Sequence, residues 1–151
     1  MQESQELSAT LEDYLEAVCR LEGEKGGARV RDIADALSVH KSTVSSALKG
    51  LAERGLVNYS PYEVTTITPQ GRRVAQEIMG RHEMITRFLA DVLALGESEA
   101  ESNACRMEHV VDAEVMKRLS LFAEFLRQHP HTSKDWAAQV RRCIPEDTRP
   151  Q

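Results

Sequence analysis

The sequence predicts a mainly α-helical protein, with an N-terminal winged helix-turn-helix followed by an all-helical region. Three observations predict this fold. Two short amphipathic segments flank a tight break at residues 38–40. Two β-branched segments within 56–68 follow directly, and the apolar patterns after them repeat with helical spacing. We therefore expect two domains, at 1–70 and 71–151.

The first predicted helix contains the segment LEDYLEAVCRL. Leu11, Leu15 and Val18 share one face of it, and Thr10 suits the N-cap position. The glycines of EGEKGGA then end the helix. Two shorter helices follow in RVRDIADALSVHKSTVSSALKGLAERGLV, and Ser42 or a neighbour is expected to cap the second.

A β-hairpin is predicted directly after these helices. Residues 56–59 form its first strand, residues 64–68 its second, and Ser60 and Pro61 mark the turn. A hairpin in this position is the wing of a winged helix. Together with the helix-turn-helix it indicates DNA binding more specifically than the helix-turn-helix alone.

The rest of the chain predicts four helices. Pro69 opens a long helix that runs to about Leu95 and ends at Gly96. Three more are expected in ESEAESNACRMEHVV, in DAEVMKRLSLFAEFLRQ, which Pro130 ends, and in SKDWAAQVRRCI. The side chains expected to face inward are Val74, Ile78, Ile85, Leu89, Val92, Val115, Leu119, Phe122, Phe125 or Leu126, Trp136 and Val140.

Charge is unevenly distributed along the chain. The net charge of −5 alone would argue against a nucleic-acid partner. Residues 25–73, however, carry eight bases and four acids, a charge of +4, between segments of −6 and −3. A basic section that coincides with the predicted winged helix indicates a DNA-binding surface.

Other classes of protein are disfavoured by the composition. No apolar run approaches the roughly 20 residues of a membrane-spanning helix, and the polar N-terminus does not resemble a signal peptide. Cys19, Cys105 and Cys143 are widely spaced and odd in number, which argues against a disulfide framework. We therefore expect a cytoplasmic protein with no membrane partner.

The outward face of the second short helix supplies the expected DNA contacts. Val44, Leu48 and Leu51 point inward, so hydroxyl and lysine side chains point outward. Hydroxyl groups can read base edges in the major groove, and lysines suit phosphates. An ordinary solvated surface would explain any single serine, but not the whole set beside a wing. The residues expected to contact double-stranded operator DNA are Lys41, Ser42, Thr43, Ser45, Ser46, Lys49, Tyr62, Arg72 and Arg73.

Recognition of two DNA half-sites usually needs a dimer. The helical region, with Phe122, Phe125 and Trp136, is where we expect a homodimer to form.

A second group of polar residues lies in the helical region. Cys105, Glu108 and His109 have offsets of zero, three and four, which place them on one face of a helix. Nothing supplies an oxyanion hole for a thiol nucleophile, so an enzyme site is disfavoured. A plain helix surface would leave a thiol exposed, which is uncommon. As metal ligands, the three residues would need further donors.

Three further donors lie in distant segments. His82 falls on the apolar stripe of the long helix, where a histidine is more often a satisfied core residue than a ligand. Asp13 and Glu16 share a face of the first helix, and alone they are unremarkable because acids are common there.

Together these segments resemble the metal-dependent transcriptional repressors of the DtxR/MntR family. The resemblance covers about Thr10 to Ile144 and is carried by LEDYLEAVCRL, GGARVRDIADALSVHKSTVSSALKGLAERGLV, GRHEMITRFL and ACRMEHVVDAEV. The chain ends without the SH3-like domain of the larger iron-responsive members, so it resembles the two-domain, manganese-type members. The resemblance implies metal ligands at Asp13, Glu16, His82, Cys105, Glu108 and His109.

The implied ligand set is a hybrid of two types. Manganese-type members have the aspartate of Asp13 but a glutamate in place of Cys105, whereas iron-type members have methionine and cysteine at these positions. Carboxylates favour Mn²⁺ and Fe²⁺, and a thiolate shifts the preference towards Fe²⁺, Co²⁺, Zn²⁺ or Cd²⁺. We expect Mn²⁺ or Fe²⁺, with Mn²⁺ slightly ahead.

The ancillary metal site of the iron-type members is altered here. It has a glutamate where this chain has Thr86, and a histidine where it has Glu101. A changed second site that uses His82 and Glu101 stays open.

The resemblance implies a repressor of metal-uptake genes, in which the ion fixes the spacing of the two recognition helices in the dimer. Two alternatives remain. One is a winged-helix regulator that responds to oxidation or to an organic ligand through Cys105, and the less favoured one is a thiol enzyme.

Overall fold

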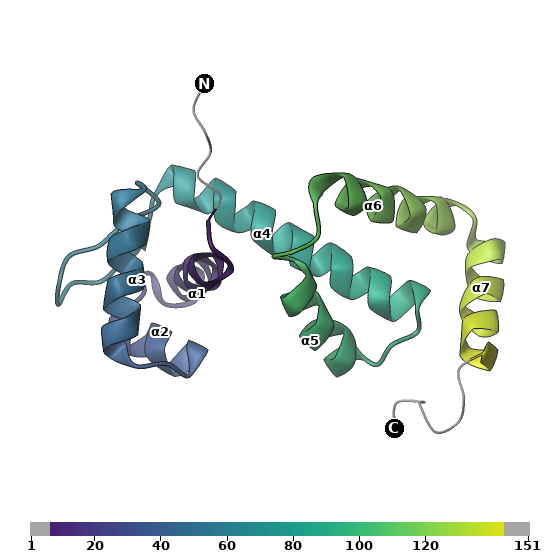
Figure 1. Ribbon diagram of the computed structural model, residues 1–151, viewed down its shortest axis with the longest axis horizontal. Helices are drawn as coiled ribbons and strands as arrows, with labels where there is room; N and C mark the ends of the chain where they lie inside the picture. Colours follow the sequence, from purple (N-terminus) through teal and green to yellow (C-terminus); the bar gives the residue numbers. More distant parts are fainter. Residues whose placement is uncertain (1–6, 144–151) are drawn as a thin grey trace. The chain divides into compact units, whose positions relative to one another are not determined.

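The computed structural model describes residues 7–143, which form helices and one two-stranded hairpin (Figure 1). The mainly helical fold with a hairpin after the helix-turn-helix is confirmed. The elements are α1 (Ala9–Lys25), α2 (Val30–Leu37), α3 (Lys41–Glu53), β1 (Val57–Asn58), β2 (Thr66–Ile67), α4 (Pro69–Arg87), the π-helical segment η1 (Phe88–Val92), α5 (Glu97–Met107), α6 (Ala113–Gln128) and α7 (Pro130–Cys143).

The chain divides into two compact units between Met79 and Gly80, so α4 begins in the N-terminal unit and ends in the C-terminal unit. The domain boundary expected at residue 70 stays a prediction. None of the helices among residues 7–143 is both long and apolar enough to span a bilayer.

The core of the N-terminal unit lies where α1, α2 and α3 pack together. Leu15, Ile33, Val44, Leu48 and Leu51 are all completely buried there. Burying one such aliphatic side chain contributes about 1.5–3 kcal/mol to folding. The inward face predicted for α3 is therefore confirmed, and its opposite face is left for solvent or a partner.

Two helix starts differ from the predictions. The N-cap of α1 is Ser8 rather than Thr10, because the Ser8 side-chain oxygen accepts a hydrogen bond from the Leu11 N–H at 3.4 Å. The N-cap of α3 is His40, which has the extended backbone that the position requires but makes no side-chain capping bond. Ser42 lies inside the first turn of α3, so it cannot cap that helix.

The predicted wing forms, although its regular strands are short. Val57 pairs with Ile67 in an antiparallel arrangement, and Asn58 pairs with Thr66. The segment between α1 and α2 adds an isolated bridge, in which Ala28 and Thr65 exchange backbone hydrogen bonds of 2.9 and 2.8 Å. The second strand of the wing is therefore hydrogen-bonded to β1 on one side, and the residue before it is hydrogen-bonded to Ala28.

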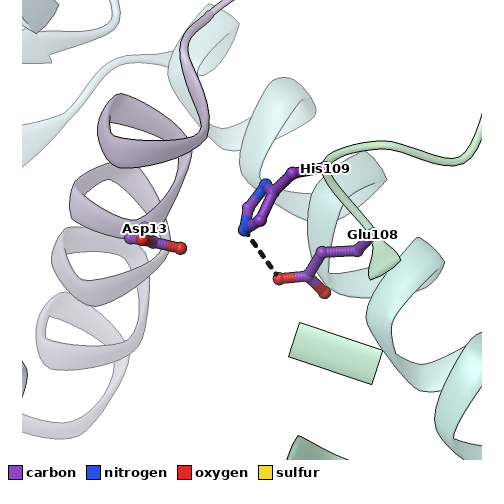
Figure 2. A group of neighbouring side chains, drawn as sticks. All are labelled: Asp13, Glu108 and His109. Carbon is purple, nitrogen blue, oxygen red and sulfur yellow. Dashed lines mark ion pairs between the residues drawn. The ribbon is translucent and has the colours of Figure 1, made fainter. Parts of the chain in front are cut away.

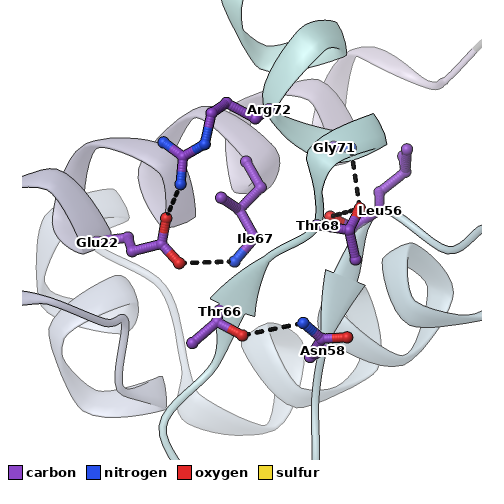
Figure 3. A network of polar contacts seen from close by, with 8 residues as sticks. All are labelled: Glu22, Leu56, Asn58, Thr66, Ile67, Thr68, Gly71 and Arg72. Carbon is purple, nitrogen blue, oxygen red and sulfur yellow. Dashed lines mark hydrogen bonds and ion pairs between the residues drawn. The ribbon is translucent and has the colours of Figure 1, made fainter.

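Side chains of α1 and α4 contact the base of the wing (Figure 3). One carboxylate oxygen of Glu22 accepts a hydrogen bond from the Ile67 N–H at 3.0 Å, and the other pairs with Arg72. The otherwise unpaired edge N–H of β2 thus gains a charged acceptor. A hydrogen bond of 3.0 Å from the Asn58 side-chain amide to the Thr66 hydroxyl joins the two strands.

Thr68 starts α4. Its hydroxyl oxygen accepts a hydrogen bond from the Gly71 N–H at 3.0 Å and lies 2.7 Å from the carbonyl oxygen of Gly55, to which it donates. Pro69 occupies the first helical position, where a missing N–H costs nothing. The start predicted for this helix is confirmed.

The end predicted for the long helix is wrong. The α-helix stops at Arg87 and continues as the π-helical segment η1. Ala94 then takes a left-handed backbone with φ of 59°, and Gly96 is the N-cap of α5 rather than the end of the preceding helix. The Trp136 ring N–H donates to the Val92 carbonyl oxygen at 3.1 Å, so α7 satisfies a carbonyl group at this irregular helix end.

The apolar face predicted for α6 is only partly buried. Leu126 is buried, but Val115, Phe122 and Phe125 are 44%, 37% and 48% exposed. The prediction is therefore wrong for Val115. Phe122 makes ring contacts with Phe88 and Trp136, and of the alternatives Phe125 and Leu126, Leu126 is the buried one. The buried cluster of the C-terminal unit consists mainly of Ile85, Leu89, Ala100 and Ala104.

Gly71 and Gly80 both lie in α4, and the structure predicts opposite effects of alanine at the two positions. A Cβ on Gly71 would lie 1.9 Å from the Leu56 carbonyl oxygen, whereas a Cβ on Gly80 would meet no atom within 4 Å. Gly71→Ala should lower the free energy of unfolding by about 1–3 kcal/mol, and Gly80→Ala should raise it by about 0.5–1 kcal/mol. Urea denaturation measures both, and a shift of the two midpoints in the same direction would contradict this packing.

Candidate metal centre

A buried carboxylate lies at the centre of the polar cluster in the C-terminal unit. Glu108 is 1% exposed and follows the last residue of α5. Burying a carboxylate is costly unless cations or hydrogen-bond donors surround it. One oxygen of Glu108 lies 2.7 Å from Nδ1 of His82. The other lies 3.3 Å from Nε2 of His109, as Figure 2 shows. Two imidazoles from separate elements therefore converge on one buried acid.

The His82 ring lies between two carboxylates. Its Nε2 is 3.0 Å from a carboxylate oxygen of Glu101, opposite the contact with Glu108. Burial lowers the pKa of His82, but the hydrogen bond that its ring donates to Glu101, together with the charge of Glu108 and the hydrogen bond to it, outweighs burial, so the net pKa of His82 is raised. His82 is thus a polar residue with partners on both ring nitrogens.

The helical stripe predicted for Cys105, Glu108 and His109 is only partly formed. α5 ends at Met107, because a tight turn leads from there to the N-cap of α6. Glu108 keeps helical backbone angles, and its N–H donates to the Ala104 carbonyl oxygen at 2.9 Å, whereas His109 lies in the turn. Cys105 is on the helix and exposed. The imidazole therefore reaches Glu108 from the turn and not from the helix face.

Asp13 and Glu16 lie one turn apart on α1, in the N-terminal unit. Figure 2 labels Asp13 on this helix. Within the C-terminal unit, the structure brings together a set of four predicted residues. They are His82, Glu101, Glu108 and His109. That Asp13, Glu16 and Cys105 bind the same metal as these four residues stays a prediction.

The residues brought together fit a divalent cation. Carboxylate and imidazole groups are the donors that Mn²⁺ and Fe²⁺ take in proteins. The burial of Glu108 supports this fit, because a buried carboxylate needs a cation or hydrogen-bond donors beside it, and a bound divalent ion would supply that positive charge. Thr86, one turn after His82, has a buried hydroxyl oxygen without a hydrogen-bond partner among the described residues.

The residues expected to contact DNA lie in the N-terminal unit. Tyr62 at the wing tip is fully exposed, with a left-handed backbone of φ 69°. Ser45 is half-buried, and the Ser46 hydroxyl donates to the Ser42 carbonyl oxygen at 3.1 Å. The guanidinium group of Arg72 forms an ion pair with Glu22. The predicted contacts that are exposed are Lys41, Ser42, Thr43, Ser46, Lys49, Tyr62, Arg72 and Arg73.

Sequence reasoning missed Glu22. Its two bonds, to the Ile67 N–H and to Arg72, position the wing and the start of α4, but both partners lie at least 45 residues away in sequence. An acid near the end of a helix carries no local signal of such a role. Only the packing of α1 against β2 reveals it.

The raised pKa of His82 predicts a pH dependence in the metal-free protein. A group whose pKa is raised by folding stabilises the protein below its unfolded pKa, about 6.5 for histidine, and this stabilisation is lost as pH rises through the folded value. Wild-type protein in chelator should therefore lose stability relative to His82→Gln as pH increases across this range. Urea denaturation of both proteins from pH 5.5 to 8.5 checks this. Parallel curves would show that the carboxylates do not act on the ring.

The sequence matches two family models. They are described as "Iron dependent repressor, N-terminal DNA binding domain", at residues 6–64, and "Iron dependent repressor, metal binding and dimerisation domain", at residues 68–137. The first model covers α1, α2, α3 and β1, and the second covers the polar cluster around Glu108.

Curated relatives have similar sequences over most of their length. An uncharacterised helix-turn-helix transcriptional regulator of Methanocaldococcus jannaschii is 34% identical over 119 residues, which cover 78% of this chain and 95% of the relative. The transcriptional regulator MntR of Geobacillus kaustophilus is 32% identical over 119 residues, which cover 79% and 84% of the two chains.

A solved structure has the same fold. It is a manganese-dependent transcriptional repressor in complex with manganese, with a TM-score of 0.69 and 28% identity. The match covers 76% of this chain and 53% of that repressor, so the chain spans about half of its length. With the two family models and the curated relatives, this identifies the chain. It belongs to the DtxR/MntR family of metal-dependent transcriptional repressors, with a DNA-binding domain followed by a metal-binding and dimerisation domain.

Proposed function

We propose that this protein is a cytoplasmic repressor of metal-uptake genes, which binds double-stranded operator DNA as a homodimer when loaded with Mn²⁺ or Fe²⁺. The observation that supports the metal requirement is the buried carboxylate of Glu108 between the imidazoles of His82 and His109. It lies within the region matched by the metal-binding and dimerisation model. Membership of a family of transcriptional regulators supports a role in DNA binding and not in catalysis.

The proposed ligands come from both units. They are Asp13, Glu16, His82, Cys105, Glu108 and His109. A bound divalent ion would supply the positive charge that lets these acids lie close together. Because α1 carries two of the donors, loading would restrict the DNA-binding unit, and DNA would select the dimers with the correct separation of recognition helices. Such coupling between metal and DNA is reciprocal.

The donor types favour manganese slightly over iron. Asp13, Glu16 and Glu108 offer carboxylate oxygens, which suit Mn²⁺, while the Cys105 thiolate moves the preference towards Fe²⁺, and Zn²⁺, Co²⁺ or Cd²⁺ would bind in vitro. The structural relative that carries manganese supports the same order.

The proposed homodimer surface includes α6. Val115, Leu121, Phe122 and Phe125 are between 37% and 60% exposed in the single chain. Clustered exposed apolar side chains, aromatic ones above all, are typical of a protein interface. A second copy is the occupant that the dimerisation model supports.

Removing proposed ligands from either unit should uncouple DNA binding from metal. For DNA selected by the wild-type protein from a random library with Mn²⁺, we expect wild-type affinity to rise about 5- to 150-fold between chelator and Mn²⁺. Asp13→Ala and Cys105→Ala should each lose most of this increase, whereas Asp91→Ala, an exposed acid outside the proposed site, should keep it. Fluorescence anisotropy measures the affinities.

Equal wild-type affinity with Mn²⁺ and with chelator would exclude the proposed mechanism. The alternative in which Cys105 senses oxidation gives a different result with Cys105→Ser. That variant would keep metal-dependent DNA binding but lose a response to peroxide that the wild type shows.

The lysines of α3 should act on phosphates. Lys41, at the first position of α3, and Lys49 are both exposed, whereas Val44, Leu48 and Leu51 are buried. Lys41→Ala should weaken DNA binding about equally for all sequences and reduce the slope of log affinity against log salt by about 1. Lys117→Ala, an exposed lysine on α6, is the matched control and should leave the slope unchanged. A slope unchanged in Lys41→Ala would remove Lys41 from the DNA surface.

A further inference from the structure

Glu101 has a place in the structure that the proposed ligand set does not use. It lies on α5, seven residues before Glu108, so the two carboxylates lie on the same side of the helix, two turns apart. The His82 ring lies between them, with Nε2 3.0 Å from Glu101 and Nδ1 2.7 Å from Glu108. Glu108 is buried, whereas the Glu101 side chain is 64% exposed.

The two carboxylates compete for one proton. A neutral imidazole is protonated on a single nitrogen, and the other nitrogen carries the lone pair that can bind a metal. Glu108 alone would favour the proton on Nδ1, in the short hydrogen bond between them. The nitrogen that faces the buried acid would then be blocked. Glu101 favours the proton on Nε2, which leaves the Nδ1 lone pair directed at the buried side of the cluster.

A second ion bound by Glu101 is less well supported. Around Nε2 of His82 the described residues provide Glu101 as the acidic donor, and Thr86 one turn further along α4 offers only a hydroxyl group. Mn²⁺ and Fe²⁺ need more ligands than these, and a carboxylate that is 64% exposed is well placed to orient the ring from the solvent side.

We propose that Glu101 is a positioning residue, which accepts a hydrogen bond from Nε2–H of His82 and so keeps Nδ1 available to the metal beside Glu108. The inference rests on the proposed metal site. Histidine ligands in metal sites generally donate their second ring N–H to a carboxylate or carbonyl group, and loss of that acceptor weakens metal binding about 10- to 100-fold.

The tautomer of His82 can be measured without metal. We would record long-range ¹H–¹⁵N spectra of ¹⁵N-histidine-labelled protein in chelator, well above pH 6.5 so that the ring is neutral, and assign His82 with His82→Gln. In the wild type the Nε2–H tautomer should be populated because of Glu101, although the 2.7 Å contact with Glu108 favours Nδ1–H. Glu101→Ala should shift the population to Nδ1–H, Glu101→Gln should restore it because the amide oxygen still accepts, and Glu99→Ala should have no effect. An unchanged tautomer in Glu101→Ala would overturn the proposal.

Calorimetric titration with Mn²⁺ separates positioning from ligation. Glu101→Ala should weaken Mn²⁺ binding about 10- to 100-fold without changing the number of ions bound, and Glu101→Gln should recover most of the affinity. Loss of one bound ion in Glu101→Ala, with the remaining affinity unchanged, would make Glu101 a ligand and overturn the proposal. If wild-type protein bound no Mn²⁺, the proposed function would fail, while the spectra in chelator would still test the role of Glu101 on the ring.

Discussion

The buried carboxylate of Glu108 is the constraint on which the C-terminal unit depends. A charge that is 1% exposed must be compensated within the chain or by an ion. Among the described residues, the imidazoles of His82 on α4 and of His109 in the turn after α5 contact the two oxygens of this carboxylate. The same arrangement places imidazole nitrogen and carboxylate oxygen donors around one position. Its electrostatic requirement and its proposed metal binding therefore have one physical cause.

The N-terminal unit joins the proposed ligands of α1 to the DNA-reading elements by direct contacts. α1 carries Asp13 and Glu16 near its start, and Glu22 near its end. Glu22 binds the edge N–H of β2 and pairs with Arg72 at the start of α4. A restraint placed on α1 would therefore act on the wing and on α4 through hydrogen bonds. This gives the proposed link between metal loading and DNA affinity a physical connection within one unit.

The exposed apolar side chains of α6 need a partner to bury them, and we propose that this partner is a second copy of the chain. A helix that left Val115 and Phe125 exposed without a partner would lose part of the free energy that burial of such residues usually contributes. Burial in a dimer would recover it. The same contact would place two winged helices on one particle, which recognition of two DNA half-sites requires.

The sequence by itself determined the order of the elements and the inward face of α3, which follow from local periodicity and turn chemistry and need no knowledge of distant contacts. The full set of metal ligands was implied by the resemblance to the family and stays a prediction. Tertiary structure decided that α4 becomes η1 after Arg87, that Glu22 anchors the wing, and that His82 lies between Glu101 and Glu108 rather than among apolar side chains. Each of these features depends on contacts between groups that are distant in sequence. A local pattern of residues cannot predict such contacts.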